Sequence, residues 1–519
     1  MLSSLDVMIV AFYATALFAL AQWVSREKPG HTKDATDYFL ASKSLPWWAI
    51  GASLIAANIS AEQIIGMSGS GYAIGLAIAS YEWMAAITLI LVGKYLLPVF
   101  LKTGIYTMPQ FLEQRYDHRV KTVMASFWMG VYVFVNLTSI LWLGALAINT
   151  VAGIDLTLGL ILLGIFAMSY SLYGGLKAVA LTDIVQVVLL VAGGLMIAAI
   201  LLEQISGGAG VMAGFVTLME RVPDRFDMIL AQDHPHYMSL PGVSVLIGGM
   251  WVMNVSYWGF NQYIIQRALA AKSVKEAQKG IAFAAFLKLL MPVIVVLPGI
   301  AMYALNAELA TPDQAYPSAM ALLPAGIKGL VFAALLAAIV SSLASMCNSI
   351  STIFTVDLLP SMVSEQWLDR HRLASGRGTA LIAMMIAMMA AQPLLGNFDQ
   401  AFQYIQEFTG FFTPGIVAIF LLGIFWRKTT ATGALLAAVG SAVLSLAMKL
   451  LMPTLPFIDR VGLVFLLCVV IVVVWSLAKP QSQPGHIELS GVSFATTTGF
   501  NAAGIVVSCM LAFFYVTWW

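Results

Sequence analysis

The chain has 519 residues, of which 60% are hydrophobic and 10% are charged, whereas soluble domains average about 45–50% apolar and about 25% charged residues. The 26 basic and 25 acidic residues leave a net charge of +1, so the basic excess typical of nucleic-acid-binding proteins is missing. Three cysteines are too few for a disulfide-stabilised scaffold. The composition indicates a chain that lies mostly within a lipid bilayer.

Fourteen apolar segments are each close to the ~20 residues that a membrane-spanning helix needs. They are roughly 6–24, 47–70, 74–101, 123–148, 155–173, 180–202, 245–267, 278–303, 326–357, 379–396, 400–425, 431–452, 460–478 and 497–518. We expect the first to be retained, because no basic residue precedes it and no A-x-A cleavage site follows its apolar core. The sequence therefore predicts an all-α, polytopic membrane protein.

The distribution of basic residues predicts its orientation. With the N-terminus outside, 19 Lys and Arg residues fall in inner loops and 5 on the outer side, as the positive-inside rule requires. We therefore expect a multi-pass protein of the cell (inner) membrane with both termini on the outer, periplasmic side.

The loops are too short for an attached catalytic domain. The longest polar stretch, 203–244, cannot hold a nucleotide-binding domain, and no G-x-x-x-x-G-K-[ST] motif occurs. All six histidines fall in loops, which argues against a metal-dependent enzyme within the membrane. We predict that the chain is not an enzyme, and that it uses no organic cofactor and no obligatory protein partner.

Polar residues recur at similar depth in several spans. At ~1.5 Å per residue, about ten residues reach the middle of a ~30 Å hydrocarbon core. Near that depth lie Gln63, Glu82, Asn254, Tyr257, Lys288 and Gln406. Charges inside spans are costly and usually functional, so a shared central cavity is our interpretation. A structural ion pair, interhelical hydrogen bonds and ordinary aromatic packing remain alternatives for the individual residues.

Two spans contain the signals of broken helices. The second carries Ala56-Ala-Asn-Ile-Ser-Ala-Glu-Gln63 followed by glycines, and the seventh carries polar residues between Asn254 and Gln262. Because these spans are five apart, we predict two inverted five-helix repeats, each beginning with a broken helix. The predicted organisation is a leading helix and linker (1–46), a first repeat (47–202), an outer loop (203–244), a second repeat (245–425) and three C-terminal helices (426–519).

The ninth span offers hydroxyl groups to a cation. Ser341 and Ser345 are four residues apart and share one helical face. Sodium is a hard cation that prefers oxygen ligands, and unwound carbonyls of the second span would complete a weak site. The alternative is that these serines bond to their own helix or allow close helix packing.

Five long stretches of the chain are informative: 37–72, GIYTMPQFLEQRY (104–116), YGGLKAVALTDIVQ (173–186), NQYIIQRALAAKSVKEAQKG (261–280) and AAIVSSLASMCNSISTIF (337–354). In this order they resemble the sodium:solute symporter family, and within it the bacterial sodium/galactose cotransporters. The resemblance covers about 37–425 and implies a leucine-transporter-like fold. The implied function is sodium-coupled uptake of a small neutral sugar by alternating access.

The resemblance also implies roles for individual residues. The sugar site would comprise Gln63, Glu82, Asn254, Lys288, Ser345 and Gln406, with Tyr257 as the inner gate and Trp258 beside it. Met67, Tyr81 and Phe402 would form the outer gate. Sodium would bind the carbonyls of Ala56, Ile59 and Ala338 and the hydroxyls of Ser341 and Ser342, with Asp183 on its exit path.

Two positions depart from the galactose transporters. Ala85 stands where they have a serine, and Ser256 stands where they have an aromatic residue. The first change leaves the identity of the sugar open, and the second affects the inner gate.

Several alternatives remain on the sequence alone. The solute of a same-family symporter would be inositol, sialic acid, proline or pantothenate instead of a hexose. Protons would replace sodium if Asp183, Glu62 or Glu82 carried the coupling. A membrane enzyme, a channel and a sensor lack supporting motifs.

Overall fold

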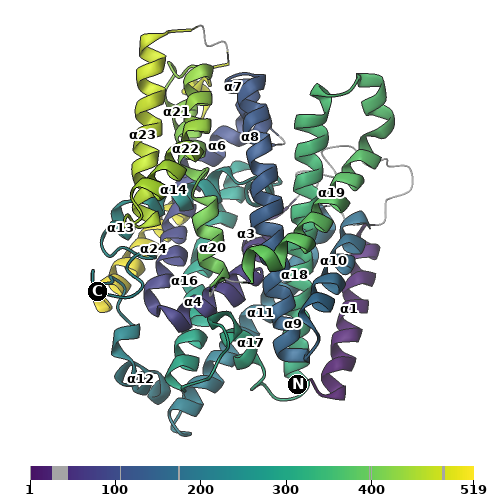
Figure 1. Ribbon diagram of the computed structural model, residues 1–519, viewed down its shortest axis with the longest axis vertical. Coiled ribbons are helices and arrows are strands. Elements are labelled where there is room, and N and C mark those ends of the chain that lie inside the picture. Colours follow the sequence, from purple (N-terminus) through teal and green to yellow (C-terminus); the bar gives the residue numbers. More distant parts are fainter. Residues whose placement is uncertain are drawn as a thin grey trace.

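The structure is a computed structural model that describes residues 2–25, 45–105, 107–173, 176–396, 398, 400–481 and 485–519. These residues are almost entirely helical, and one isolated bridge, between Leu45 and Ala271, is the extended pairing found among them. Figure 1 shows most helices running along the long axis, with α12 at one end of the molecule and α7 at the other.

The helices follow one another in chain order as a bundle. They are α1 (Ser4–Ser25), α3 (Trp47–Asn58), α4 (Met67–Ala73), α5 (Ser80–Leu91), α6 (Leu97–Thr103), α7 (Met108–Arg115), α8 (His118–Val131), α9 (Thr138–Ala152), α10 (Leu156–Tyr173), α11 (Leu176–Ile205), α12 (Val211–Arg221), α13 (Ser244–Ile247), α14 (Gly249–Val255), α15 (Gln262–Leu269), α16 (Val274–Ala304), α17 (Ala315–Met320), α18 (Ile327–Thr352), α19 (Glu365–Leu395), α20 (Ala401–Thr409), α21 (Thr413–Phe425), α22 (Ala431–Leu451), α23 (Phe457–Ala478) and α24 (Thr498–Thr517). Wider π-helical turns lie at η2 (Glu62–Gly66), η4 (Val92–Leu96), η5 (Tyr132–Leu137), η7 (Ser256–Phe260) and η9 (Ile353–Leu358).

Many of these helices are long and apolar enough to cross a bilayer. In the described part of the chain nine qualify, or eleven if each of two sharply bent pairs is one span. Two shorter apolar helices, Ser4–Leu17 and Leu156–Ser169, add to them. The protein is therefore an all-helical, multi-pass membrane protein, as predicted, and the count of fourteen spans stays a prediction.

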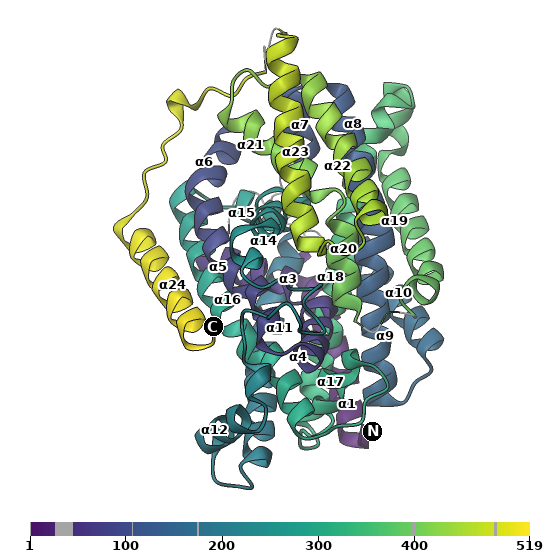
Figure 2. The same cartoon turned by 60° about the vertical axis from the view of Figure 1, so that its left-hand side comes forward.

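The predicted break in the second span is present. α3 ends at Asn58, Ile59 leaves the helical region with φ −72° and ψ 77°, and the helix resumes at Glu62 with a bend of 63°. The amide of Ser60 bonds back to the carbonyl of Asn58 at 2.8 Å. Figures 1 and 2 place α3 and α4 near the middle of the bundle, where free backbone groups are tolerated within a membrane.

The seventh predicted span is interrupted as well. α14 passes into η7, Asn261 is extended, and α15 begins at Gln262. A third interruption, a 46° bend between α20 and α21, was not predicted. Gly410 lies at that bend, but a single glycine is common in membrane helices and carries little signal.

The first helix is anchored to the N-terminal end of α18. The Asp6 carboxylate accepts hydrogen bonds from the backbone amides of Gly326 at 2.7 Å and Gly329 at 2.9 Å. Because the first amides of a helix lack partners within it and carry partial positive charge, a carboxylate there is stabilising. This contact holds α1 beside the helix that carries Ser341 and Ser342.

Glycine allows α16 and α4 to lie in close contact. A Cβ atom on Gly299 would lie 2.1 Å from the Ser68 carbonyl oxygen and 2.7 Å from the Tyr72 amide nitrogen. Backbone cannot yield as a side chain can, so only glycine fits at this crossing.

We predict that Gly299→Ala destabilises the protein by about 1–3 kcal/mol, the usual cost of overpacking, because α16 must move away from α4. Thermal unfolding of the purified protein in detergent measures the effect. Gly130→Ala is the matched control, because a Cβ there meets no described atom within 4 Å and helical alanine is favoured over glycine. Equal stability of both variants would contradict the packing argument.

Candidate functional site

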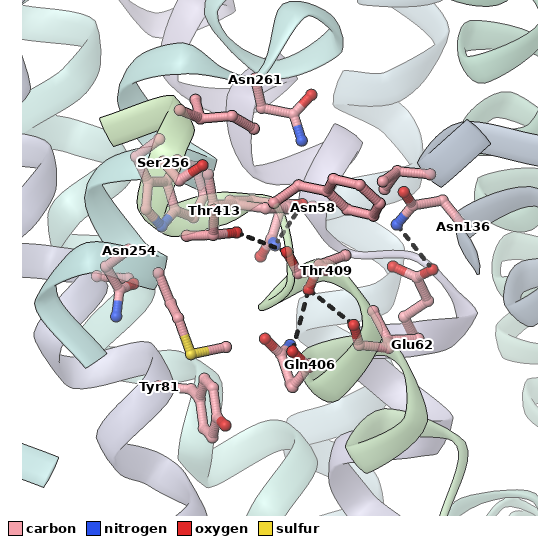
Figure 3. Close-up of a pocket in the computed structure, with 18 of the residues that line it drawn as sticks. Asn58, Glu62, Tyr81, Asn136, Asn254, Ser256, Asn261, Gln406, Thr409 and Thr413 are labelled. Carbon is pink, nitrogen blue, oxygen red and sulfur yellow. Dashed lines mark hydrogen bonds between the residues drawn. The ribbon is translucent and has the colours of Figure 1, made fainter. Parts of the chain in front are cut away.

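A central cavity of about 120 Å³ lies where the interrupted helices meet. Its wall is built from α3, η2, α5, α8, η5, α14, η7, α16, α20 and α21. Figure 3 shows polar side chains from several of these elements converging on it. Segments that are hundreds of residues apart in sequence therefore contribute to one site.

A buried ion pair lies in the wall of the cavity. Lys288 Nζ lies 2.5 Å from Glu82 Oε2, and the two side chains are 0% and 4% exposed. Gln63 Nε2 donates to the other oxygen of Glu82, and Lys288 also donates to Asn58 Oδ1. Buried charges persist only when they are paired and hydrogen-bonded, and this network satisfies both.

Aromatic groups extend the network. The Tyr257 hydroxyl accepts from Asn58 Nδ2 at 3.1 Å and lies 2.7 Å from the Tyr263 hydroxyl. The ring of Trp258 lies below Lys288, 5.0 Å from Nζ to the centroid, which is within cation–π range. η7 thus presents one aromatic residue to the ion pair and another to the broken end of α3.

The cavity is covered on one side. The rings of Tyr81 and Phe402 meet edge to face at 5.1 Å, and both residues are buried. Met67 is also buried, and its Sδ accepts from Gln63 Nε2 at 3.2 Å. The predicted outer-gate residues therefore lie together against the ion-pair network.

The opposite part of the cavity is lined by residues nearer the basic loops. This wall is formed by Phe127 of α8, by Ile416 of α21 and by Phe412, which directly precedes α21. α8 begins, and α21 ends, next to loops rich in Arg and Lys. The cavity thus extends from the ion pair toward the side expected to be cytoplasmic.

Most of the predicted sugar-site residues come together. Those that line the cavity are Gln63, Glu82, Asn254, Tyr257, Trp258, Lys288 and Gln406. Ser345 is not among the lining residues; its hydroxyl accepts from Arg267 at 3.4 Å. Ala85 and Ser256, the two departures from the family pattern, both line the cavity.

The predicted sugar site did not include several polar residues that line the cavity. They are Asn58, Glu62, Asn136, Asn261, Thr409 and Thr413. Asn136 Nδ2 approaches Glu62 Oε1 at 3.5 Å, and Asn261 Oδ1 accepts from Tyr132 at 2.7 Å. Asn136 is an isolated amide in an apolar segment, a signal that points to function in a membrane helix.

Two of the predicted sodium residues, Ala56 and Ile59, lie at the C-terminal end of α3, beside its break. Ala56 and Ile59 are buried next to the break, and α18, which carries Ala338, Ser341 and Ser342, packs against α3. Within the described part of the chain the buried Ser342 hydroxyl has no hydrogen-bond partner. A buried hydroxyl without a partner is unfavourable, and oxygen donors suit a hard cation, so these residues fit sodium.

Two other observations concern cations. Asp183 lies outside the residues whose side chains the structure describes. In the described residues no cluster of three or more His, Cys, Asp or Glu side chains forms a transition-metal site.

Comparisons with known proteins find relatives over most of the chain. The sequence model of the Sodium:solute symporter family matches residues 38–440 of this chain. A Vibrio parahaemolyticus protein named sodium/glucose cotransporter is 51% identical, over 100% of this chain and 99% of its own length. A Mus musculus sodium/myo-inositol cotransporter is 32% identical, over 97% of this chain and 73% of its own.

The solved structure of a Na⁺-coupled sialic acid symporter in a substrate-bound outward-open state has the same fold. The TM-score between that structure and this one is 0.79, at 22% sequence identity, and the match covers 93% of this chain and 99% of that chain.

We predict that Glu82→Gln and Lys288→Met each destabilise the protein by about 3–5 kcal/mol, because each leaves one uncompensated buried charge. The double variant is expected to lose much less than the sum, since it removes both charges. Thermal unfolding of the four proteins measures the coupling. Arg119→Met serves as the control, because the pair of Arg119 and Asp117 is 63% and 30% exposed and such a pair contributes about 1 kcal/mol or less. Additive losses in the double variant would show that the pair is not coupled.

Proposed function

This chain belongs to the sodium:solute symporter family, and on that premise we propose that it couples inward sodium flow to the uptake of a neutral hexose such as galactose or glucose. The observation that carries the proposal is the buried Glu82–Lys288 pair, which faces a polar cavity of about 120 Å³ beside Tyr257 and Trp258. The 51% identity to a protein named sodium/glucose cotransporter supports the same solute class.

The chemistry of the cavity suits a polyhydroxylated, uncharged solute. Glu82 accepts hydrogen bonds from hydroxyl groups, whereas Lys288, Gln63, Asn254 and Gln406 donate them. Because Lys288 neutralises Glu82, a neutral solute enters without leaving a charge unbalanced. The aromatic faces at η7 favour the apolar face of a sugar ring, which is a readily reversed contact.

Sodium would bind at the break in α3. The proposed ligands are the carbonyls of Ala56, Ile59 and Ala338 and the hydroxyls of Ser341 and Ser342. Support comes from the buried Ser342 hydroxyl without a partner and from the packing of α18 on α3. Asn58, at the end of α3, reaches the sugar cavity through Lys288 and Tyr257, so the same broken helix contributes to both sites.

Coupling then follows from shared conformational preference. If sodium and sugar each favour the conformation in which the helix break is ordered, each raises the affinity for the other. One charge moving through 100 mV releases about 2.3 kcal/mol, which corresponds to roughly fifty-fold accumulation before the sodium gradient itself adds more.

The proposed topology has fourteen spans in the inner membrane with both termini outside. Residues 47–202 and 245–425 form the inverted repeats of a leucine-transporter-like fold. Met67, Tyr81 and Phe402 close the outer side, Tyr257 closes the inner side, and Asp183 lies on the ion's exit path. The covered Tyr81–Phe402 side and the cavity's extension toward Phe412 and Ile416 support an inward-facing arrangement.

A related solute, myo-inositol, is the second candidate. Ala85 in the cavity wall removes a hydroxyl that galactose transporters would offer, and the chain is 32% identical to a sodium/myo-inositol cotransporter. Inositol is also a neutral polyol, so the Glu82–Lys288 pair suits it equally.

We expect the protein in liposomes to accumulate labelled galactose or glucose under an inward sodium gradient, and not under potassium. Unlabelled galactose, glucose and myo-inositol, added in turn as competitors, rank the solutes. Uptake driven equally by a pH gradient without sodium would overturn sodium coupling, and uptake inhibited only by inositol would replace the hexose assignment.

Glu82→Ala is expected to abolish sugar binding in folded protein.

We predict that Ser342→Ala raises the sodium concentration for half-maximal uptake roughly ten-fold, as expected when a hydrogen-bonding or ligating group of this strength is lost. The sugar concentration for half-maximal uptake at saturating sodium should change much less. Ser349→Ala is the matched control, because this buried serine on α18 bonds to its own helix at the Ser345 carbonyl, 3.0 Å away. Equal effects on sodium and sugar in Ser342→Ala would contradict separate sites.

A further inference from the structure

A buried arginine joins the two helices that hold the proposed sodium ligands. Arg267 is 2% exposed. Its Nε donates to the Ser53 hydroxyl of α3 at 3.1 Å, and one terminal nitrogen donates to the Ser345 hydroxyl of α18 at 3.4 Å. The other terminal nitrogen donates to the Tyr263 carbonyl in its own helix, α15.

The positions of both serines place the guanidinium beside the sodium ligands. Ser53 precedes Ala56 by three residues, and Ser345 follows Ser341 by four, so each lies about one helical turn, roughly 4.5–6 Å along the axis, from a proposed ligand. In the proposed orientation α3 runs away from the cytoplasm and α18 runs toward it. Both serines, and the arginine between them, then lie on the cytoplasmic side of the sodium site.

The sodium ligands are not open to the sugar cavity. Among the described residues that line the central cavity, none belongs to the five proposed sodium ligands, and all five are buried. Arg267 lies between α3 and α18, on the side of these ligands that the proposed orientation makes cytoplasmic. Because Arg267 is 2% exposed and hydrogen-bonded to both helices, its side chain fills the space between them.

We propose that Arg267 is a cytoplasmic gate for sodium, separate from Tyr257 at the sugar cavity, and that it prevents sodium from crossing without sugar. This inference rests on the proposed sodium symport. The guanidinium closes the seam between α3 and α18 while it bridges Ser53 and Ser345, and it opens the seam when those hydrogen bonds break.

The contacts of α15 connect this gate to the sugar site. The Tyr263 carbonyl accepts from Arg267, and the Tyr263 hydroxyl lies 2.7 Å from the Tyr257 hydroxyl, which in turn accepts from Asn58. A movement of Tyr257 when sugar leaves therefore reaches the helical turn that positions Arg267. This connection explains how sugar release and sodium release are kept in order.

The experiment measures flux of labelled sodium through liposomes in the absence of sugar, together with sodium-dependent sugar uptake. Arg267→Lys keeps the charge but cannot bridge both serines, and Ser53→Ala with Ser345→Ala keeps the arginine but removes its partners. We expect both proteins to carry sodium without sugar roughly ten-fold faster than wild type, the shift expected from losing one charge-assisted hydrogen bond.

Arg115→Lys is the matched control. Arg115 is another buried arginine, 1% exposed, but it donates to carbonyl groups at the end of α21, including Gly423 at 2.6 Å. The control is expected to lose thermal stability without conducting sodium. Equal sodium flux in Arg115→Lys would assign the effect to general loosening and overturn the gate.

The remaining outcomes separate the two proposals. Wild-type sodium flux in a folded Arg267→Lys or double-serine variant that still binds sugar would overturn the gate. If Arg267→Lys does not fold, the double-serine variant alone decides. Wild-type protein that takes up sugar without regard to sodium would instead overturn the proposed function.

Discussion

The buried pair of Glu82 and Lys288 is the interaction on which the site depends. Neither charge is tolerable alone inside a membrane protein, because an unpaired buried charge costs several kcal/mol. α5 and α16 must therefore hold the two side chains within 2.5 Å of each other. Gln63 and Asn58 satisfy the remaining hydrogen bonds, which ties the broken span to the same pair.

The second constraint is the backbone of the interrupted helices. In hydrocarbon, free amides and carbonyls are tolerated only where protein or a polar cavity surrounds them. The break after Asn58 lies in the middle of the bundle, packed by α16 and α18. Close packing at Gly299 brings α16 against α4, so the break, the ion pair and the cavity occupy one compact region.

Much of this region was predictable from the sequence. A charge in an apolar segment is costly enough to signal function wherever it occurs, so Glu82 and Lys288 were identified from their depth. Polar and glycine residues within a span predicted the breaks near Asn58 and Asn261. The resemblance to a family added the sodium residues, of which Ser342 has the buried hydroxyl expected of a ligand.

The sequence by itself determined the membrane class, the helical segments and the set of polar residues at mid-depth, because composition and helical rise act locally along the chain. Only the tertiary structure decided which of those residues face one another. Ser345 shares a helix with Ser341, yet it bonds to Arg267 and does not line the cavity. Asn136 lines it although its segment is mostly apolar and contains no other amide side chain close by. The direction in which a side chain points depends on the packing of neighbouring helices. Arg267 and Ser345, for example, are 78 positions apart, and a contact over that separation leaves no local pattern in the sequence.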